Sequence, residues 1–196
     1  MNLAIIKYNA GNIQSVLYAL ERLGVQAVVT DKAEEILSAD KVIFPGVGEA
    51  SSAMQSLREN RLDELIPQLK QPVLGICVGM QLLCAHSEEN NTDSLNIVPI
   101  QVKKFRTADA TLKIPQVGWN NIYDLKSKLF RNIPENSYIY NVHSYYAEDS
   151  DYTIATCLYG VAYAAAIKKD NFYGVQFHTE KSAGTGDTII QNFLHL

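Results

Sequence analysis

The chain has 196 residues, of which 47% are hydrophobic, a formal net charge of −4 at pH 7 and a pI near 5.6. This composition suffices for a sizeable core without disulfides or metal, so we expect one soluble domain spanning residues 1–196. The sequence has no basic stripe or Lys/Arg cluster, which excludes the usual electrostatic footprint of a nucleic-acid-binding protein.

Cysteine usage and hydropathy predict a cytoplasmic protein. Cys77, Cys84 and Cys157 are an odd number at scattered positions, which argues against an extracellular disulfide framework. The first residues lack a basic segment followed by a long apolar one, and no run approaches the roughly 18 apolar residues that span a bilayer. We therefore expect no membrane association.

The first half alternates short apolar, β-branched runs with segments of helical period. The pattern predicts strands at residues 3–6, 25–30, 41–44 and 73–76, and helices at 13–23, near Glu34, and at 50–57, 62–69 and 78–86. Alternating strands and helices predict a parallel sheet with helices on both faces. Functional sites in such folds lie beyond the carboxyl ends of the strands.

The second half changes character to strands separated by turns. We expect strands at residues 97–105, 138–143, 153–158, 162–167 and 172–177, a hairpin turn at Lys169-Asp170-Asn171, and a last helix at 187–194. The polar stretch 87–94 is a candidate mobile surface loop. The predicted fold class is three-layer α/β, with a mixed, mostly parallel sheet flanked by helices and antiparallel strands in the C-terminal half.

Cys77 lies in the pentapeptide Gly75-Ile76-Cys77-Val78-Gly79, between a predicted strand and a predicted helix. A glycine-flanked turn of this kind holds a nucleophile clear of its own backbone, and glycines are needed because any Cβ would collide there. Unpaired N–H groups at the helix start favour a thiolate and an oxyanion. A buried structural cysteine is the alternative interpretation. The flanking glycines favour a nucleophile.

A base for this thiol is offered by residues 173–180. A thiol with a pKa near 8.5 is mostly protonated at neutral pH, so a cysteine hydrolase needs a base, and the base needs an orienting group. If the segment is extended, Gln176, His178 and Glu180 share one side, while Thr179 points away. We therefore predict that Glu180 binds one imidazole nitrogen of His178 and that the other nitrogen takes the thiol proton.

The other histidines have weaker claims to a chemical role. We expect His86 to lie near the end of a helix and to interact with its last carbonyl groups, and His195 lies beside the last residue of the sequence. His143 ends a predicted apolar strand. For His143 a structural or backbone-positioning role is favoured over acid–base chemistry.

A glycine-rich loop, Pro45-Gly46-Val47-Gly48-Glu49, follows the third predicted strand. It lacks the Lys-Ser/Thr of a phosphate-binding loop and the full spacing of a dinucleotide-binding turn. We interpret it as a turn that offers backbone N–H groups to an oxyanion beside Cys77, where one donor is worth about 2.7 to 4 kcal/mol in the transition state. An ordinary glycine turn is the alternative.

Three segments resemble motifs of the class I glutamine amidotransferases and occur in the same order. They are the glycine-rich loop at 45–48, the cysteine motif at 75–81, which Met80 and Gln81 complete, and the segment 176–180. The match runs essentially from end to end. It also includes Tyr8-Asn9-Ala10-Gly11-Asn12 followed by Ser15-Val16, then Val117-Gly118-Trp119-Asn120, then Val142-His143-Ser144-Tyr145. Together the six segments are similar to the branch whose glutaminase serves a separate cyclase in histidine biosynthesis.

The resemblance implies hydrolysis of L-glutamine to glutamate and ammonia through a glutamyl thioester. Cys77 would attack the amide carbon, His178 would move the protons, and Glu180 would hold His178. Backbone N–H groups of Val78 and of the Val47-Gly48 turn would form the oxyanion hole.

Substrate contacts and cofactor needs are implied in the same way. Gln81, one helical turn past the nucleophile, and the backbone of Ser144 and Tyr145 would bind glutamine. Gly46 and Gly48 would be small so that glutamine can lie against the chain. The resemblance implies no cofactor and no metal.

The resemblance also implies a protein partner. This is a (β/α)8 barrel cyclase that forms a heterodimer with the glutaminase, receives ammonia through a protected path, and makes imidazole glycerol phosphate and aminoimidazole carboxamide ribonucleotide. Asn12, Trp119 and Lys181 are the candidate interface residues. We expect low glutaminase activity without the partner, because free activity would waste glutamine.

The chain departs from the family pattern at three positions. Thr179 stands where the family usually has Pro between the His and the Glu, which removes a rigid φ angle. Lys7 and Asn9 replace an acidic residue and a glycine common in the first loop. The change at Thr179 loosens the expected geometry of the strand end, the changes at Lys7 and Asn9 bear on the partner-facing edge, and all three leave the triad side chains intact.

Three other functions fit parts of the same pattern. One is a glutaminase of another class I amidotransferase, serving anthranilate, guanylate or pyridoxal phosphate synthesis. The second is a Cys-His peptidase or amidase, which would cleave peptide bonds without preferring free glutamine. The third is a catalytically silent binding module, which the intact Cys77, His178 and Glu180 disfavour.

Overall fold

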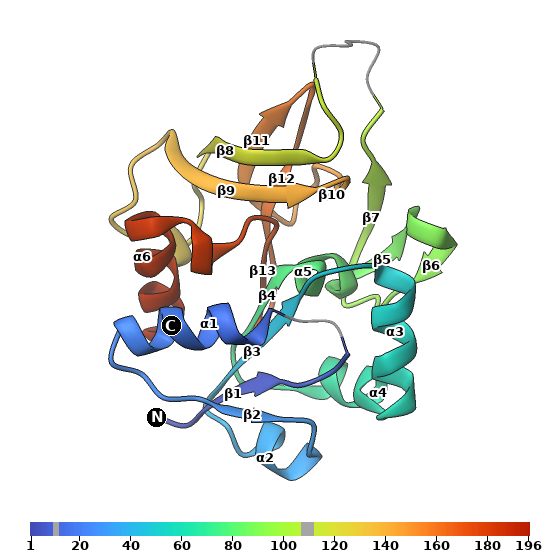
Figure 1. Cartoon of the computed structure of the whole chain (residues 1–196), viewed down its shortest axis with the longest axis vertical. Coiled ribbons are helices and arrows are strands. Elements are labelled where there is room, and N and C mark those ends of the chain that lie inside the picture. The colour runs from blue at the N-terminus through green and yellow to red at the C-terminus, as the bar shows by residue number, and fades with distance from the viewer. Residues whose placement is uncertain (10–11, 107–111) are drawn as a thin grey trace.

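The computed structural model describes residues 1–9, 12–106 and 112–196 of the chain (Figure 1). Ala10 and Gly11 of the first motif lie outside these residues. The described strands pair into one mixed sheet, parallel in the N-terminal half and mostly antiparallel in the C-terminal half. The predicted α/β fold class is confirmed.

The N-terminal half forms the parallel part of the sheet. Its strand order is β2 (Val28–Thr30), β1 (Leu3–Ile6), β3 (Lys41–Gly46) and β4 (Val73–Cys77). Every residue of β1, β3 and β4 is buried. This burial explains their continuous apolar runs, because parallel strands are covered by helices on both faces.

Helices cover the two faces of this parallel part. In Figure 1 the strands lie between α1 and α6 on one side and α3 and α4 on the other. The helices are α1 (Ile13–Arg22), α2 (Ala33–Leu37), α3 (Ala50–Glu59), α4 (Leu62–Leu65) with the 3-10 turn η1 (Ile66–Gln68), α5 (Val78–Leu83) and α6 (Ala183–Leu194). Within the described ranges, no helix has the length and apolarity that crossing a bilayer requires.

Strand β13 (Phe172–Val175) joins the two halves of the sheet. It pairs in parallel with β4, with Val175 opposite Ile76, and antiparallel with β12 (Val161–Lys169). Because β4 and β13 are parallel, their carboxyl ends meet at the same edge of the sheet. The residues after Ile76 and Val175 therefore start from neighbouring points, although about a hundred residues separate them in sequence.

The C-terminal half continues the sheet from β12 through β10 (Tyr145–Ala147), β7 (Val98–Lys104), β5 (Cys84–Ser87) and β6 (Thr92–Asp93). A branch runs from β12 through β11 (Thr153–Tyr159) and β8 (Gln116–Tyr123) to β9 (Ser137–His143), with the 3-10 turn η3 (Lys128–Phe130) between β8 and β9.

The predicted hairpin turn between β12 and β13 is confirmed, since Lys169 pairs with Phe172 across Asp170-Asn171. The sequence pattern did not predict strands β8 and β10. Gly118, with a φ of +121°, and the polar residues of β8 weaken its strand pattern.

The helix predicted to extend to His86 is too long, and its prediction is wrong at the C-terminal end. Helix α5 ends at Leu83, Cys84 adopts an extended conformation, and the chain continues as β5, where Cys84 pairs with Val98. Pairing with β7 therefore overrides the helical pattern. His86 does not cap a helix; its Nδ1 lies 2.9 Å from Asp93 Oδ1.

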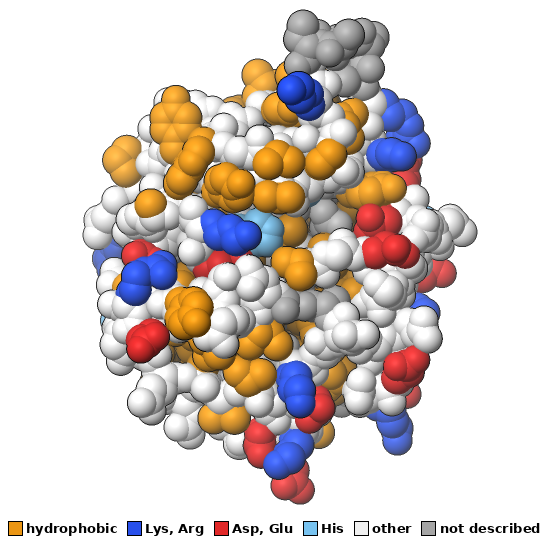
Figure 2. All heavy atoms as spheres, in the orientation of Figure 1, with side chains coloured by type: hydrophobic (Ala, Val, Ile, Leu, Met, Phe, Trp, Pro, Cys, Tyr) orange, Lys and Arg blue, Asp and Glu red, His pale blue; other side chains and the backbone are white. Residues whose placement is uncertain are grey.

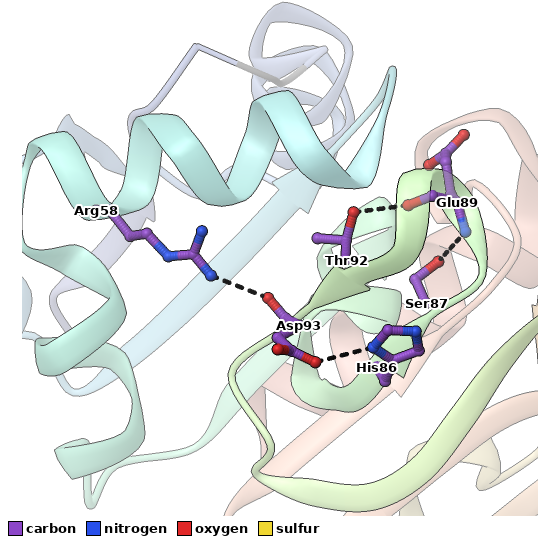
Figure 3. A network of polar contacts seen from close by, with 6 residues as sticks. All are labelled: Arg58, His86, Ser87, Glu89, Thr92 and Asp93. Atoms are coloured by element: carbon purple, nitrogen blue, oxygen red, sulfur yellow. Dashed lines mark hydrogen bonds and ion pairs between the residues drawn. The ribbon is translucent and has the colours of Figure 1, made fainter.

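Polar residues 87–94, expected to form a loop, are structured (Figure 3). The stretch contains the 3-10 turn η2 (Glu89–Asn91) and β6, which pairs with β5. Thr92 Oγ1 donates to Glu89 O at 2.6 Å, and Arg58 Nη2 on α3 donates to Asp93 O at 3.2 Å. Side-chain hydrogen bonds satisfy this backbone, which is why a run without apolar periodicity holds its shape.

Candidate active site

Cys77 connects β4 to α5 in a strained conformation. Its φ of +54° and ψ of −112° lie in a region that residues with a Cβ rarely adopt. Strain of this kind persists only where the surroundings fix it and is typical of functional sites. The predicted nucleophile turn is therefore present in the backbone geometry.

The glycines on either side of Cys77 allow α5 to start against the sheet. A Cβ on Gly79 would lie 1.9 Å from the carbonyl oxygen of Phe44 on β3. A Cβ on Gly75 would lie 2.9 Å from the backbone of Gly79. Both positions exclude any side chain, so this packing fixes the strained turn at Cys77.

His178 and Glu180 contact each other, but not for the predicted reason. His178 Nδ1 lies 2.7 Å from Glu180 Oε1, and both side chains are buried. The prediction of a continuous extended segment is wrong, because β13 ends at Val175 and residues Thr179–Lys181 form the 3-10 turn η4. A turn, rather than strand alternation, folds the carboxylate back onto the imidazole.

Hydrogen bonds hold this second turn in place. Ser182 Oγ donates to His178 O at 2.6 Å and accepts from Tyr140 N at 3.0 Å, and His178 N donates to Tyr140 O at 2.9 Å. Thr179, where the family usually has Pro, is fully buried, and its carbonyl oxygen accepts from Ser182 N. These bonds fix the turn without a proline.

One pocket of about 360 Å³ brings Cys77 and His178 together at the edge where β4 and β13 end. Burial lowers the pKa of His178. Its hydrogen bonds to Cys77 and Glu180, and the negative charges of these two groups, raise the pKa by more than burial lowers it, to about 10. His178 is therefore protonated at neutral pH when Cys77 is a thiolate. The pair can supply a nucleophile and a proton in one place.

The loop after β3 forms one wall of this pocket. Val47 and Gly48 line it beside Cys77 and Val78, and Gly48 has a φ of +94° that favours glycine. Gly46 instead packs behind the pocket, where a Cβ would lie 2.5 Å from Gly79 N. Packing against α5 is enough to require a small residue here, and the contact of Gly46 with glutamine stays a prediction.

Tyr8 supports this loop from behind. Its hydroxyl donates to Pro45 O at 2.7 Å. Burial, together with the negative charge of Cys77, raises the pKa of Tyr8 well above its usual value. Tyr8 is therefore a neutral hydrogen-bond donor that fixes the turn.

The predicted substrate residues lie on the opposite wall. Gln81, Ser144 and Tyr145 all line the pocket. Gln81 Nε2 donates to Tyr145 O and to Gln176 Oε1, both at 3.0 Å. Both amide hydrogens of Gln81 are thus used within the protein, and its Oε1 is the atom available to a ligand.

Glu89 is a pocket residue that the sequence analysis missed. It lies on η2, lines the pocket, and accepts a hydrogen bond from Ala50 N at 2.7 Å through Oε2. Burial raises the pKa of Glu89, the bond from Ala50 lowers it, and the charge of Glu49 raises it, with a net upward shift. Nothing in the polar run 87–94 marked Glu89, because its position depends on the structure of that run.

His143 also lines the pocket, in agreement with the expected positioning role. Its Nδ1 lies 2.8 Å from Tyr145 O, and its Nε2 lies 3.3 Å from the hydroxyl of Tyr163. Burial lowers the pKa of His143 to about 4, opposed by its bond to Tyr145 and reinforced by the charge of His178. His143 is therefore neutral at pH 7.

An apolar face lies beside the pocket mouth on β8 and β9. Val117 pairs with Val142, and Trp119 pairs with Tyr140, on the outer side of these strands. Trp119 is 54% exposed, and Tyr138 on the same face is 64% exposed. Figure 2 shows apolar side chains gathered across this part of the molecule, with a His and a basic side chain immediately below.

The three predicted interface residues do not all lie on this face. Trp119 lies on it, and the exposed Lys181 lines the pocket mouth. Asn12 lies elsewhere, in a small hollow that it lines with His178 and Glu180 behind the pocket. Glu180 Oε2 is buried and accepts no hydrogen bond from any described residue.

Comparisons with known proteins agree with this geometry. The family model for glutamine amidotransferase class-I matches residues 4–196. The imidazole glycerol phosphate synthase subunits HisH of Bacteroides thetaiotaomicron and Salmonella typhimurium are 53% and 46% identical to the chain, each over 100% of both chains.

Solved structures show the same fold at low identity. One titled glutamine amidotransferase has a TM-score of 0.76 at 15% identity and covers 100% of this chain and 98% of its own. A glutamine amidotransferase from Thermotoga maritima has a TM-score of 0.65 at 17% identity, covering 100% and 83%. With the full-length sequence matches, these findings show that the chain belongs to the class-I glutamine amidotransferase family.

Proposed function

We propose that residues 1–196 form one glutaminase domain, the glutamine-hydrolysing subunit of an imidazole glycerol phosphate synthase in histidine biosynthesis. The observation that carries this proposal is the pocket lined by both the strained Cys77 and His178, whose imidazole is held from behind by Glu180. The full-length similarity to HisH subunits supports the choice of synthase.

The first half of the reaction forms a thioester. The thiolate of Cys77 attacks the side-chain amide carbon of glutamine, and the carbonyl oxygen becomes an oxyanion. The protonated imidazole of His178 gives its proton to the amide nitrogen, so the C–N bond breaks and ammonia leaves. Glu180 keeps the imidazole oriented and stabilises its positive charge during this step.

The second half returns the enzyme to its starting state. His178, now neutral, takes a proton from water as the water oxygen attacks the thioester carbon. The C–S bond then breaks, releasing glutamate and regenerating the thiolate–imidazolium pair. Backbone N–H groups of Val78 and of the Val47-Gly48 turn stabilise both oxyanions, since these residues line the pocket beside the sulfur.

Glutamine recognition uses the far wall of the pocket. The carboxylate of Glu89 and the free Oε1 of Gln81 are acceptors that suit the α-ammonium group of the substrate. The backbone of Ser144 and Tyr145 holds the rest of the amino-acid moiety. A pocket of about 360 Å³ suits a free amino acid rather than a folded protein chain.

The partner in this proposal is a (β/α)8 barrel cyclase that docks on the apolar face of β8 and β9. Exposed Val117, Trp119 and Tyr138 form a patch of the kind found at protein interfaces. Lys181 at the pocket mouth lies where ammonia would leave. Docking there would close the exit to bulk water, where ammonia is mostly protonated.

Glutamine hydrolysis, measured with and without the cyclase and its ribonucleotide substrate, tests this function. We expect low turnover alone, strong stimulation by the liganded cyclase, and loss of turnover in Cys77→Ala. Full activity without the partner, or cleavage of peptide bonds without preference for free glutamine, would contradict the proposal.

The docking face can be tested separately. We expect Trp119→Ala to weaken cyclase binding, whereas Leu37→Ala, which removes an equally exposed apolar side chain on α2, should leave binding unchanged. Equal binding by the two variants would argue against the apolar face. Calorimetric titration with the cyclase measures both.

A further inference from the structure

A chain of hydrogen bonds between buried side chains leads to the sulfur of Cys77. Gln81 Nε2 donates to Tyr145 O at 3.0 Å and to Gln176 Oε1 at 3.0 Å. Gln176 Nε2 then lies 3.9 Å from Cys77 Sγ, within the range of an N–H···S hydrogen bond. Gln81 is 3% exposed and Gln176 is fully buried, so bulk solvent has little access to these bonds.

The direction of every bond in this chain follows from its first member. A backbone carbonyl such as Tyr145 O can only accept, so the side-chain nitrogen of Gln81 must face it. The same nitrogen then presents its second hydrogen to Gln176, whose oxygen must therefore face Gln81. As a result the nitrogen of Gln176 must face the sulfur and can only donate to it.

His143 reinforces this direction. Its Nδ1 also contacts Tyr145 O, and the ring must carry a hydrogen on that nitrogen to do so. The hydroxyl of Tyr163 then faces the acceptor Nε2 of the ring. The carbonyl of Tyr145, which belongs to the predicted substrate-binding wall, is thus held by two donors.

We propose that Gln176 is a positioning residue for the nucleophile: oriented by Gln81 and Tyr145, it donates an N–H to Cys77 Sγ and favours the thiolate over the thiol. A hydrogen bond to the charged form stabilises that form, and a buried donor does so more strongly than an exposed one. This role rests on the proposed function only in taking Cys77 as the nucleophile. It adds a second support to the thiolate, independent of His178.

Other ionisable groups also face the sulfur or its pocket and contribute to its titration. They are His178 and Glu180 on the turn after β13, Tyr8 behind the loop after β3, and His143, Glu89 and Lys181 around the pocket. The test therefore compares variants that leave all of these groups unchanged.

The experiment measures the rate of Cys77 alkylation by iodoacetamide against pH in the full-length protein, with mass spectrometry confirming the modified cysteine. We expect Gln176→Met, which keeps the volume but removes both polar atoms, to raise the midpoint of the profile by about one unit. A shift of one unit is a tenfold change in the equilibrium between thiol and thiolate. Gln81→Leu should shift the midpoint in the same direction by less, because Gln176 stays but loses its orientation.

Asn141→Leu is the matched control. Asn141 is another fully buried amide, and its polar atoms have no partner among the residues that the structure describes. Its removal should leave the midpoint unchanged. Thermal unfolding of each variant verifies the fold.

An unshifted midpoint in folded Gln176→Met, or an equal shift in Asn141→Leu, would overturn the proposal. If Gln176→Met does not fold, an unshifted midpoint in Gln81→Leu overturns it. The two proposals can fail separately. If the wild type shows no glutamine hydrolysis with the cyclase, the proposed function fails, but the alkylation profiles still test the role of Gln176.

Discussion

The two turns that meet in the pocket place their functional side chains by different means. Each presses a backbone carbonyl against a helix glycine: Phe44 O against Gly79, and Thr179 O against Gly186. Cys77 is nevertheless strained, with a φ of +54°, whereas His178 has an ordinary φ of −83°. The His178 turn is held instead by hydrogen bonds from Ser182 and to Tyr140.

The difference in backbone strain between Cys77 and His178 matches the different positions that a nucleophile and a base must take. The sulfur must stand clear of its own backbone so that a substrate carbon and an oxyanion can fit beside it, which an unstrained strand-to-helix turn does not allow. The imidazole must only keep its orientation, and hydrogen bonds suffice for that. Substitutions at Cys77 should therefore act through backbone strain, and those at Ser182 through lost hydrogen bonds.

The largest expected effect is that of Gly79→Ala. The new Cβ would lie 1.9 Å from Phe44 O, so α5 must move away from β3. We expect a loss of about 4 kcal/mol in the free energy of unfolding, or failure to fold, measured by urea denaturation.

Gly184→Ala is the control for this change. No described atom lies within 4 Å of the position that its Cβ would take on α6, so we expect a gain of about 0.5 to 1 kcal/mol from the reduced flexibility of the unfolded chain. Wild-type stability in Gly79→Ala would show that the cysteine turn is not fixed by close packing.

The second prediction concerns pH. The folded pKa of His178 is about 10, above the unfolded value near 6.5, so the charged imidazole contributes stability that is fully present below pH 6.5. This contribution is lost as pH rises through 10.

We therefore expect the difference in unfolding free energy between wild type and His178→Asn to fall between pH 6.5 and 10. Chemical denaturation of both proteins at several pH values measures it. Groups that do not contact His178 cancel, whereas Cys77 and Glu180 titrate together with it. A difference that rises with pH over this range would contradict the raised pKa of His178.

Ser182→Ala should have the third largest effect. It removes one of the two donors to His178 O, the other being Lys181 N, and leaves Tyr140 N without its side-chain acceptor, at an expected cost of about 1 to 3 kcal/mol. Ser38→Ala, which removes only an exposed hydroxyl bonded to Glu35 O, should cost less than about 0.5 kcal/mol. Equal costs would mean that the His178 turn does not depend on these bonds.

The smallest expected effect compares glycine with alanine at each turn. Cys77→Gly should be more stable than Cys77→Ala by about 1 to 2 kcal/mol, because only glycine adopts a positive φ without strain. At His178 the order should reverse, since its φ is ordinary. Thermal unfolding measures all four variants, and the same order at both positions would remove the contrast between the turns.

The sequence predicted the reactive residues of the pocket better than it predicted the backbone that positions them. Cys77, His178 and Glu180 were predicted to meet; the structure brings Cys77 and His178 to one pocket, and Glu180 contacts the imidazole from behind it. The reason offered for the His178–Glu180 contact was wrong, because a 3-10 turn replaces the expected strand. Period-two alternation could not reveal this, since both faces of the segment are buried.

Elements that depend on distant partners were the ones predicted poorly. Helix α5 stops at Leu83 because β7 offers Cys84 a strand to pair with, and the run 87–94 is ordered by bonds to its own backbone and to α3. Glu89 was missed for this reason. The three-residue strand β10 has too few residues to show a period.

The sequence by itself determined the local features: the alternation of strands and helices, the glycines that permit a strained turn, and the residue types of a thiol, a base and a carboxylate. The tertiary structure alone decided that β13 pairs in parallel beside β4, which places the two turns at one edge. It also decided the direction of the hydrogen bonds through Gln81 and Gln176. Local patterns follow from short-range sterics, whereas strand order and buried polar bonds depend on contacts between segments about a hundred residues apart.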